Sequence, residues 1–184
     1  MHRALVVIGI VFALSPRPVR AQDAAAPSRD ALVAMLSGFE DAPTLADVRA
    51  LGEGAVPVLI AIHDDPSVIA PARLRAVEAV GAFTSAEART FLLRVMHDPA
   101  EPAAVVREAI EALASAAGAD AIGPIREFLR SPDRGTRERA IEALGAIGTV
   151  AARRVLEAHV AHEHDAALAD RARTLASTPA RATH

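Results

Sequence analysis

The chain has 184 residues, 52% hydrophobic and 23% charged, which is the composition of one globular domain with a sizeable core and not of a disordered chain. Its formal net charge is −3 at pH 7 and its aromatic residues are all Phe, so nucleic acid, which proteins bind with clustered basic side chains and stacking aromatics, is not the expected partner. The absence of Cys excludes disulfide bonds and an anchor on a lipidated Cys.

The first 21 residues have the pattern of a secretory signal peptide. A short positive start precedes an unbroken apolar run from Ala4 to Leu14, and Val19 and Ala21 place small residues at the two positions that signal peptidase inspects. We therefore expect a periplasmic or secreted protein, cleaved after Ala21.

A retained membrane anchor is the alternative to cleavage. The apolar run has about half the length that crosses a bilayer, which favours a signal peptide, whereas Arg17 and Arg20 just beyond it oppose translocation. Cleavage would leave 17 Arg against 23 acidic residues, a net charge of −6, and no stable membrane span.

The remainder divides into a flexible lead-in at 22–29, a folded part at 30–176 and a loose tail at 177–184, because the two flanks are small, polar and without an apolar period. The folded part has a period of 33 residues. Turn-forming pairs mark this period at Asp65-Pro66, Asp98-Pro99 and Ser131-Pro132, and His164-Asp165 falls at the fourth position.

Each turn lies between two helical patterns. An apolar stripe precedes it, and in the segment that follows large apolar residues recur three apart with Ala beside them. One helix face is therefore apolar and has small side chains, which allow close contact between helices. Thr84 to Glu87 has the spacing of a capping box. No stretch alternates with the period of a strand. We therefore predict helical pairs near 30–51, 54–83, 85–117, 120–147 and 150–176.

The segments 54–60 and 136–148 resemble bacterial HEAT repeats, also called the phycobilin-lyase HEAT-like group, which are armadillo-type repeats. The resemblance covers about residues 44–160 and implies an all-α fold, an α-solenoid or alpha-alpha superhelix of about five hairpins with divergent end repeats. The motif specifies an architecture better than an activity.

One equivalent position in three successive repeats is acidic and is occupied by Glu78, Glu111 and Glu142. In a solenoid these side chains should form a row on the concave side, which makes them the leading candidates for a recognition surface. The alternative is that they pair with the Arg three or four positions earlier on the same helix, which would keep the face soluble; these residues are Arg75, Arg107 and Arg139.

A dense group of potential metal ligands lies at His159, His162, Glu163, His164 and Asp165. Two ligands three or four residues apart share a helix face, but the spacing is not that of a zinc protease and no third ligand is assigned. A polar helix end explains the same residues, and helix-end placement also explains His63 and His97.

The sequence therefore predicts an exported, non-catalytic scaffold for a protein or peptide partner, with no cofactor and no nucleic acid. It has no nucleophile elbow, no phosphate-binding glycine loop and no Cys nucleophile, so we do not expect an enzyme. The alternative is a metal-binding protein that uses His159, His162 and His164. A phycobilin-lyase activity is implied by the family name alone, and four Phe in the mature chain are few for the walls of a tetrapyrrole site.

Overall fold

The computed structural model describes residues 27–38 and 43–179, and within these ranges the chain forms helices and turns, with no strand. The predicted signal peptide lies outside the described residues, as do most of the predicted lead-in and tail. The helices of the described part are α1 (Arg29–Ser37), α2 (Leu45–Ala50), α3 (Ala55–Asp64), α4 (Ala70–Val80), α5 (Ala86–His97), α6 (Ala103–Ala117), η1 (Gly118–Ala121), α7 (Ile122–Glu127), η2 (Phe128–Arg130), α8 (Arg134–Ile147), α9 (Val150–Val160) and α10 (Ala166–Ser177).

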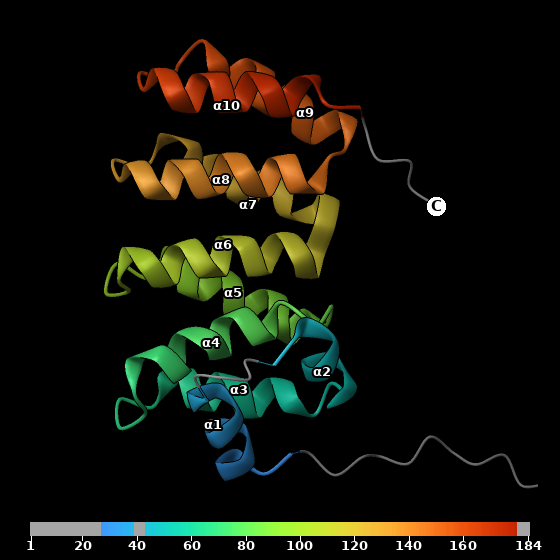
Figure 1. The fold of residues 1–184 in the computed structure, drawn as a ribbon, viewed down its shortest axis with the longest axis vertical. Coiled ribbons are helices and arrows are strands. Elements are labelled where there is room, and N and C mark those ends of the chain that lie inside the picture. The colour runs from blue at the N-terminus through green and yellow to red at the C-terminus, as the bar shows by residue number, and fades with distance from the viewer. Residues whose placement is uncertain (1–26, 39–42, 180–184) are drawn as a thin grey trace, which may run out of the picture.

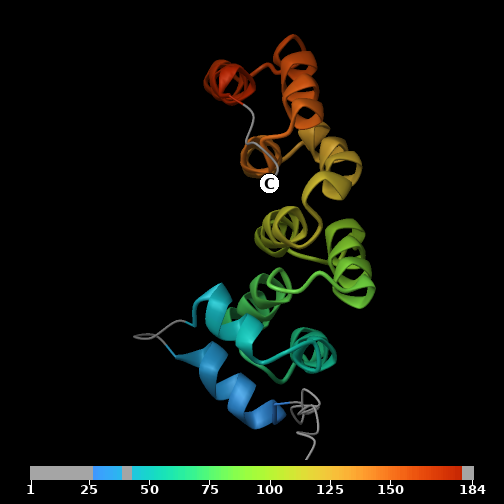
Figure 2. The same cartoon turned by 90° about the vertical axis from the view of Figure 1, so that its right-hand side faces the viewer.

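The helices form two rows along the molecule, with α4, α6, α8 and α10 in front of α3, α5, α7 and α9 in Figure 1. Each helix of the front row packs against its hairpin partner and against the next helix of the same row. Figure 2 shows the rows edge on, with α1 (blue) and α10 (red) projecting beyond α6 and α8 on the front-row side, so that this side is hollowed. The predicted α-solenoid is therefore confirmed. We call the surface formed by α4, α6, α8 and α10 the second-helix face.

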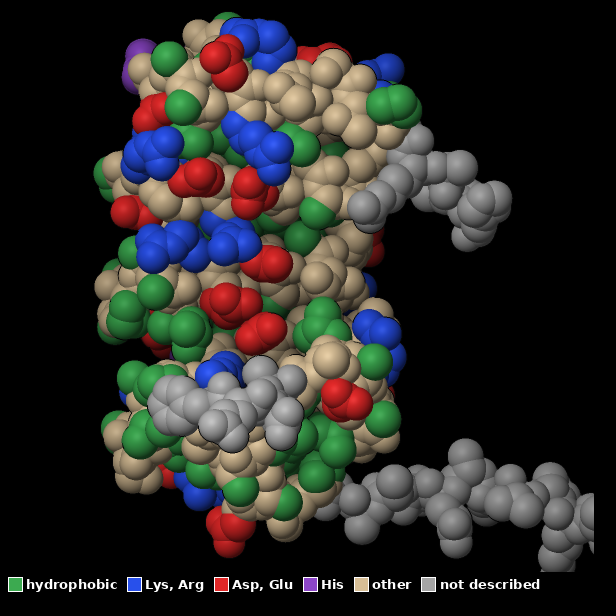
Figure 3. All heavy atoms as spheres, in the orientation of Figure 1, with side chains coloured by type: hydrophobic (Ala, Val, Ile, Leu, Met, Phe, Trp, Pro, Cys, Tyr) green, Lys and Arg blue, Asp and Glu red, His purple; other side chains and the backbone are tan. Residues whose placement is uncertain are grey.

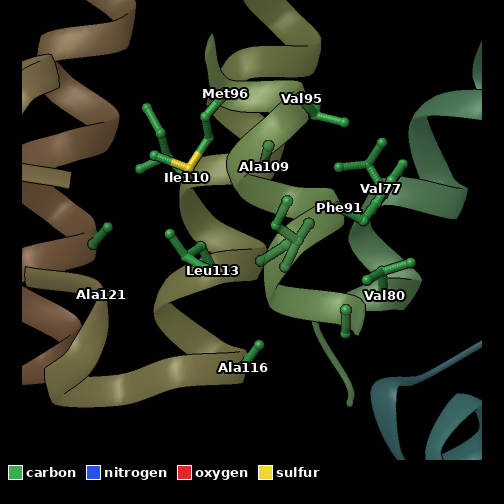
Figure 4. Close-up of a cluster of buried hydrophobic side chains, with 14 of the residues drawn as sticks. Val77, Val80, Phe91, Val95, Met96, Ala109, Ile110, Leu113, Ala116 and Ala121 are labelled. Atoms are coloured by element: carbon green, nitrogen blue, oxygen red, sulfur yellow. The ribbon is translucent and has the colours of Figure 1, made fainter. Parts of the chain in front are cut away.

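The core repeats one register from hairpin to hairpin. Three successive second helices bury an Ala followed by a large aliphatic residue, all fully inaccessible to solvent: Ala76 and Val77, Ala109 and Ile110, Ala140 and Ile141. The large side chains of one repeat meet those of the first helix before it and of the neighbouring repeats, as Figure 4 shows for the cluster around Phe91, Ile110 and Leu113. The stacked hairpins thus share one continuous apolar core.

Small residues allow neighbouring second helices to approach each other closely. A Cβ atom added at Gly81 would lie 2.8 Å from the Ala112 Cα atom of α6, and one added at Gly145 would lie 2.7 Å from the Leu175 Cδ1 atom of α10. Non-bonded carbon atoms pack at about 3.5–4 Å, so Gly81 has no room for a side chain, whereas at Gly145 the Leu175 side chain would have to shift. The seam between α4 and α6 therefore depends on glycine at position 81.

The first helices end at the predicted turns. Helix α3 ends at Asp64 and α5 at His97, each followed by the expected Asp-Pro pair. The Asp side chain of each pair accepts a hydrogen bond from a backbone N–H two residues later, at 2.8 Å for both Asp65 and Asp98. The period of 33 residues therefore arises from a recurring local turn, in which the Asp side chain stabilises the loop and the Pro ends the helix.

The fourth turn differs from its prediction. Helix α9 ends at Val160, before the expected His164-Asp165 position, and Asp165 instead caps α10 by accepting from the N–H groups of Ala167 and Leu168. The first N–H groups of a helix have no partner within the helix, and an Asp side chain at the N-cap satisfies them. Asp165 therefore belongs to the start of α10, and the turn of the last hairpin lies between Val160 and Asp165.

The helix start at residue 85 is shifted by one residue from its prediction. Ser85, and not Thr84, is the N-cap of α5, and its hydroxyl accepts from the Ala88 N–H. A full capping box occurs at the start of α2, between Thr44 and Asp47. Adjacent Thr and Ser offer the same cap chemistry, and the packing of α5 selects between them.

The first predicted pair also departs from the regular hairpin. Helix α1 packs mainly on α3 and α4, and α2 is short with Val48 as its buried residue. The end of the stack is thus covered by a single helix, as a terminal repeat with one solvent face requires. Within the described ranges no helix combines the length and apolar character needed to cross a membrane.

Candidate functional site

The structure places Glu78, Glu111 and Glu142 on successive helices of the second-helix face, α4, α6 and α8. Each follows a fully buried aliphatic residue and precedes a buried Ala, which directs its side chain away from the core. Glu78 and Glu111 are exposed, and Glu142 is half-buried. The three residues therefore occupy one register of the hollowed side, as the sequence repeats indicate.

Three ion pairs of these helices run between repeats. Arg139 of α8 pairs with Glu111 of α6, and Arg171 of α10 pairs with Glu142 of α8 at 3.1 Å. Arg107 reaches forward to Asp133, the N-cap of α8, at 3.0 Å. Figure 3 shows the result on the surface, where bands of basic and acidic side chains alternate from α6 to α10.

This pairing corrects one expectation from the sequence. Arg107 and Arg139 do not pair with the Glu one turn later on their own helices within the described residues; their partners belong to neighbouring repeats. The reason is geometric: neighbouring second helices are so close that a long Arg side chain reaches the adjacent helix. The pairs therefore tie one repeat to the next.

Arg75, the equivalent residue of α4, has a structural contact at the end of the stack. Its guanidinium donates to the carbonyl oxygens of Leu36 and Gly38, both at 2.7 Å. These groups lie at the C-terminal end of α1, where helix carbonyls lack partners within the helix. Arg75 therefore joins α1 to α4.

Glu108 belongs to the same face and was missed by the sequence prediction. It is half-buried on α6, three residues before Glu111, and burial raises the pKa of its carboxyl, with the Glu78 and Glu111 carboxylates adding to the effect and Arg139 opposing it. The spacing of three residues places it on the same helix side as Glu111, a signal that was available in the sequence. These carboxylates form an acidic patch over α4 and α6.

A groove of about 410 Å³ separates α6 from α8 on this face. Its lining combines small residues, among them Ala114 and Gly118, with the charged residues Glu111, Arg139 and Glu142. A smaller groove of about 310 Å³ continues between α8 and α10, beside Glu142 and Arg171. The second-helix face therefore offers shallow apolar hollows bordered by charges of both signs.

The histidines proposed as metal ligands do not converge. His159 is buried and its Nε2 atom lies 3.1 Å from the Glu163 carboxylate, which also accepts from Arg137, whereas His162 and His164 are exposed. Residues 27–38 and 43–179 contain no group of three or more potential ligands arranged around a common point. Nothing in this geometry favours the metal-binding alternative.

His63 and His97 lie at helix ends, where the sequence analysis placed them. The buried His63 contacts the Glu101 carboxylate at 3.0 Å and meets the Phe91 ring edge to face. His97 is exposed and contacts the carbonyl oxygen of Leu93. Both have structural contacts with their own or the next repeat.

Comparison with known families agrees with this architecture. Residues 100–176 match the family model of HEAT repeats. This segment contains α6, α8 and α10, and with them the two grooves of the second-helix face. No curated protein matches the chain.

Proposed function

This chain is a HEAT-repeat protein, and from that premise we propose that it is an exported, non-catalytic scaffold that binds a partner protein or peptide on the second-helix face. HEAT repeats commonly mediate interactions between proteins, and their family is generally non-catalytic. Stacked repeats also present an extended hollow surface, which suits a long segment better than a small molecule.

The observation that carries the proposal is the groove between α6 and α8. Its small residues leave space for an apolar side chain of the partner, while Glu111, Arg139 and Glu142 fix the register of a partner that carries charges of both signs. The edge ion pairs are exposed, and such pairs contribute only about 0.2–1 kcal/mol each, so a partner's charges can replace them at little cost.

Export belongs to the same proposal and rests on the pattern of residues 1–21. The test is expression of the full chain in a bacterial host, followed by separation of envelope and cytoplasm and N-terminal sequencing. We expect the protein outside the cytoplasm with Gln22 as its first residue. A chain that stays in the cytoplasm, or keeps its first 21 residues, would contradict cleavage and export.

The test of the binding face is a triple variant, Glu78→Gln, Glu111→Gln and Glu142→Gln, used as bait in affinity capture from the native envelope fraction. Gln keeps the side-chain shape and removes the charge. The matched control neutralises three exposed acids away from the second-helix face, Glu53, Glu87 and Glu157, and so has the same net charge.

We expect the wild type and the control to capture the same amount of one partner. The face variant should capture at least about tenfold less, because several charge contacts with the partner are weakened. Circular dichroism of all three proteins checks that each is folded. Equal capture by the face variant and the control would refute this binding face.

A further inference from the structure

A third groove lies on the opposite side of the molecule, between α7–η2 and α9, which stand behind α8 and α10 in Figure 1. Its volume is about 700 Å³, larger than that of either groove on the second-helix face. Arg126 and Arg130 line one wall, and Arg154 and His162 line the other. We call this the first-helix groove.

Helical spacing explains why these basic residues face one another. Arg126 and Arg130 are four residues apart, so they lie on one side of the α7–η2 segment. Arg154 and His162 are eight apart on the other wall, with the small Ala158 midway between them. Because Ala158 is small, it leaves space in the groove between the side chains of Arg154 and His162.

The basic side chains here differ from those of the second-helix face in having no protein partner. Arg126, Arg130 and Arg154 are exposed, and within the described residues none of them forms an ion pair or a hydrogen bond. Glu127 is the one acidic residue that lines the groove, and its carboxylate contacts His97 at 3.4 Å. The positive charge of the groove is therefore available to a ligand.

We propose that the first-helix groove binds a short acidic segment of a partner protein, with the Arg residues of both walls contacting its carboxylates. A fork-shaped guanidinium on each side of a cleft suits a row of carboxylates. Val155 and Ala158 supply apolar surface for the segment's backbone and aliphatic stems. This surface is separate from the second-helix face, so the inference stands or falls independently of the proposed function.

A short acidic peptide fits the groove better than a nucleic acid does. No Phe lines the groove, and of its two imidazole rings that of His159 is buried, so successive bases would have little stacking surface. The chain as a whole is negative, and a long polyanion that extends beyond the groove would be repelled, whereas a segment of a few residues contacts the positive walls alone.

The test measures binding of a capped, fluorescently labelled octaglutamate peptide to the purified protein by fluorescence anisotropy at low ionic strength. The groove variant is Arg126→Glu with Arg154→Glu, one substitution from each wall. The matched control is Arg89→Glu with Arg173→Glu, which makes the same change of net charge at exposed sites outside the groove. A labelled octaglutamine peptide and a labelled single-stranded oligonucleotide of eight nucleotides serve as comparison ligands.

We expect octaglutamate to bind saturably, with an affinity that falls as salt is added. The groove variant should lower this affinity by about tenfold or more, and the control variant should leave it within about twofold of wild type. Equal losses in the two double variants would overturn the inference, because the peptide would then respond to overall charge. Octaglutamine binding as tight as octaglutamate, or tighter binding of the oligonucleotide, would also overturn it. Circular dichroism confirms that both variants are folded.

Discussion

At the residue scale, Glu163 shows how a group of apparent metal ligands serves the fold. Its side chain is 2% exposed; its carboxylate accepts from the Arg137 side chain and the Asp165 N–H, both at 3.0 Å, and contacts His159. Burial alone would raise the pKa of Glu163, but these partners outweigh it and hold the pKa below its ordinary value. The network joins the end of α9 to α8.

Glu163→Gln is therefore expected to destabilise the protein at neutral pH. A hydrogen bond to a buried charged group contributes about 1.5–3 kcal/mol, and Gln cannot satisfy Arg137 as a carboxylate does. Because the folded-state pKa is lowered, the difference from wild type should be full above about pH 4.3, the ordinary value for Glu, and should shrink as the pH falls below it.

Urea unfolding at pH values from 7 to 3 measures this difference. The control is Glu157→Gln, an exposed residue of α9 for which we expect no change in the free energy of unfolding. A loss of stability in the Glu163 variant that is constant from pH 7 to 3 would contradict the assignment of the charge.

At the scale of elements, the contacts between repeats depend on small residues more than on large ones. Gly81, at the end of α4, faces the backbone of Ala112 in α6, so the two helices approach as closely as their main chains permit. The large aliphatic residues fill the space between the two rows, but the seam between neighbouring second helices is set by Ala and Gly. This seam also brings the side chains of one repeat within reach of the next.

Gly81→Ala should separate α4 from α6. The added methyl would overlap a backbone atom that cannot move alone, and overpacking of this kind costs about 1–3 kcal/mol. Gly123→Ala is the matched control, since no atom lies within 4 Å of its added Cβ, and it should leave stability unchanged or raise it by about 0.4–1 kcal/mol. Thermal unfolding compares the two, and equal melting temperatures would refute the close seam.

At the scale of the whole molecule, the fold is a stack in which each hairpin contacts its neighbours. Helix α6 packs against α4, α5 and α8, whereas α10 packs against α8 and α9 and has no repeat beyond it in the described residues. A stack of this kind gains its stability from interfaces between neighbours, so units in the middle share two interfaces and units at the ends share one.

Hydrogen exchange followed by mass spectrometry should reveal this gradient. We expect the amides of α6 and α8 to exchange most slowly and those of α1, α2 and α10 to exchange fastest, because the end units can open without breaking the central interfaces. Uniform protection along the chain would show instead that the stack unfolds as one cooperative unit.

The sequence by itself determined the stack of helical hairpins and three of its four expected turns. The Asp-Pro turns and the buried Ala-aliphatic register are local features, and the pattern repeats every hairpin, so the core positions could be predicted from spacing alone. The row of Glu78, Glu111 and Glu142 followed for the same reason, because equivalent residues of stacked repeats lie on one side.

The tertiary structure alone decided which charges meet. Arg139 pairs with Glu111 of the preceding repeat, Arg75 holds the end of α1, and Arg126 and Arg154 line opposite walls of one groove. A repeat period gives the register along each helix, but the partner of a long side chain depends on the offset and separation of neighbouring helices. The offset and separation of neighbouring helices depend on how closely they pack at Ala and Gly, which is decided only when the repeats stack.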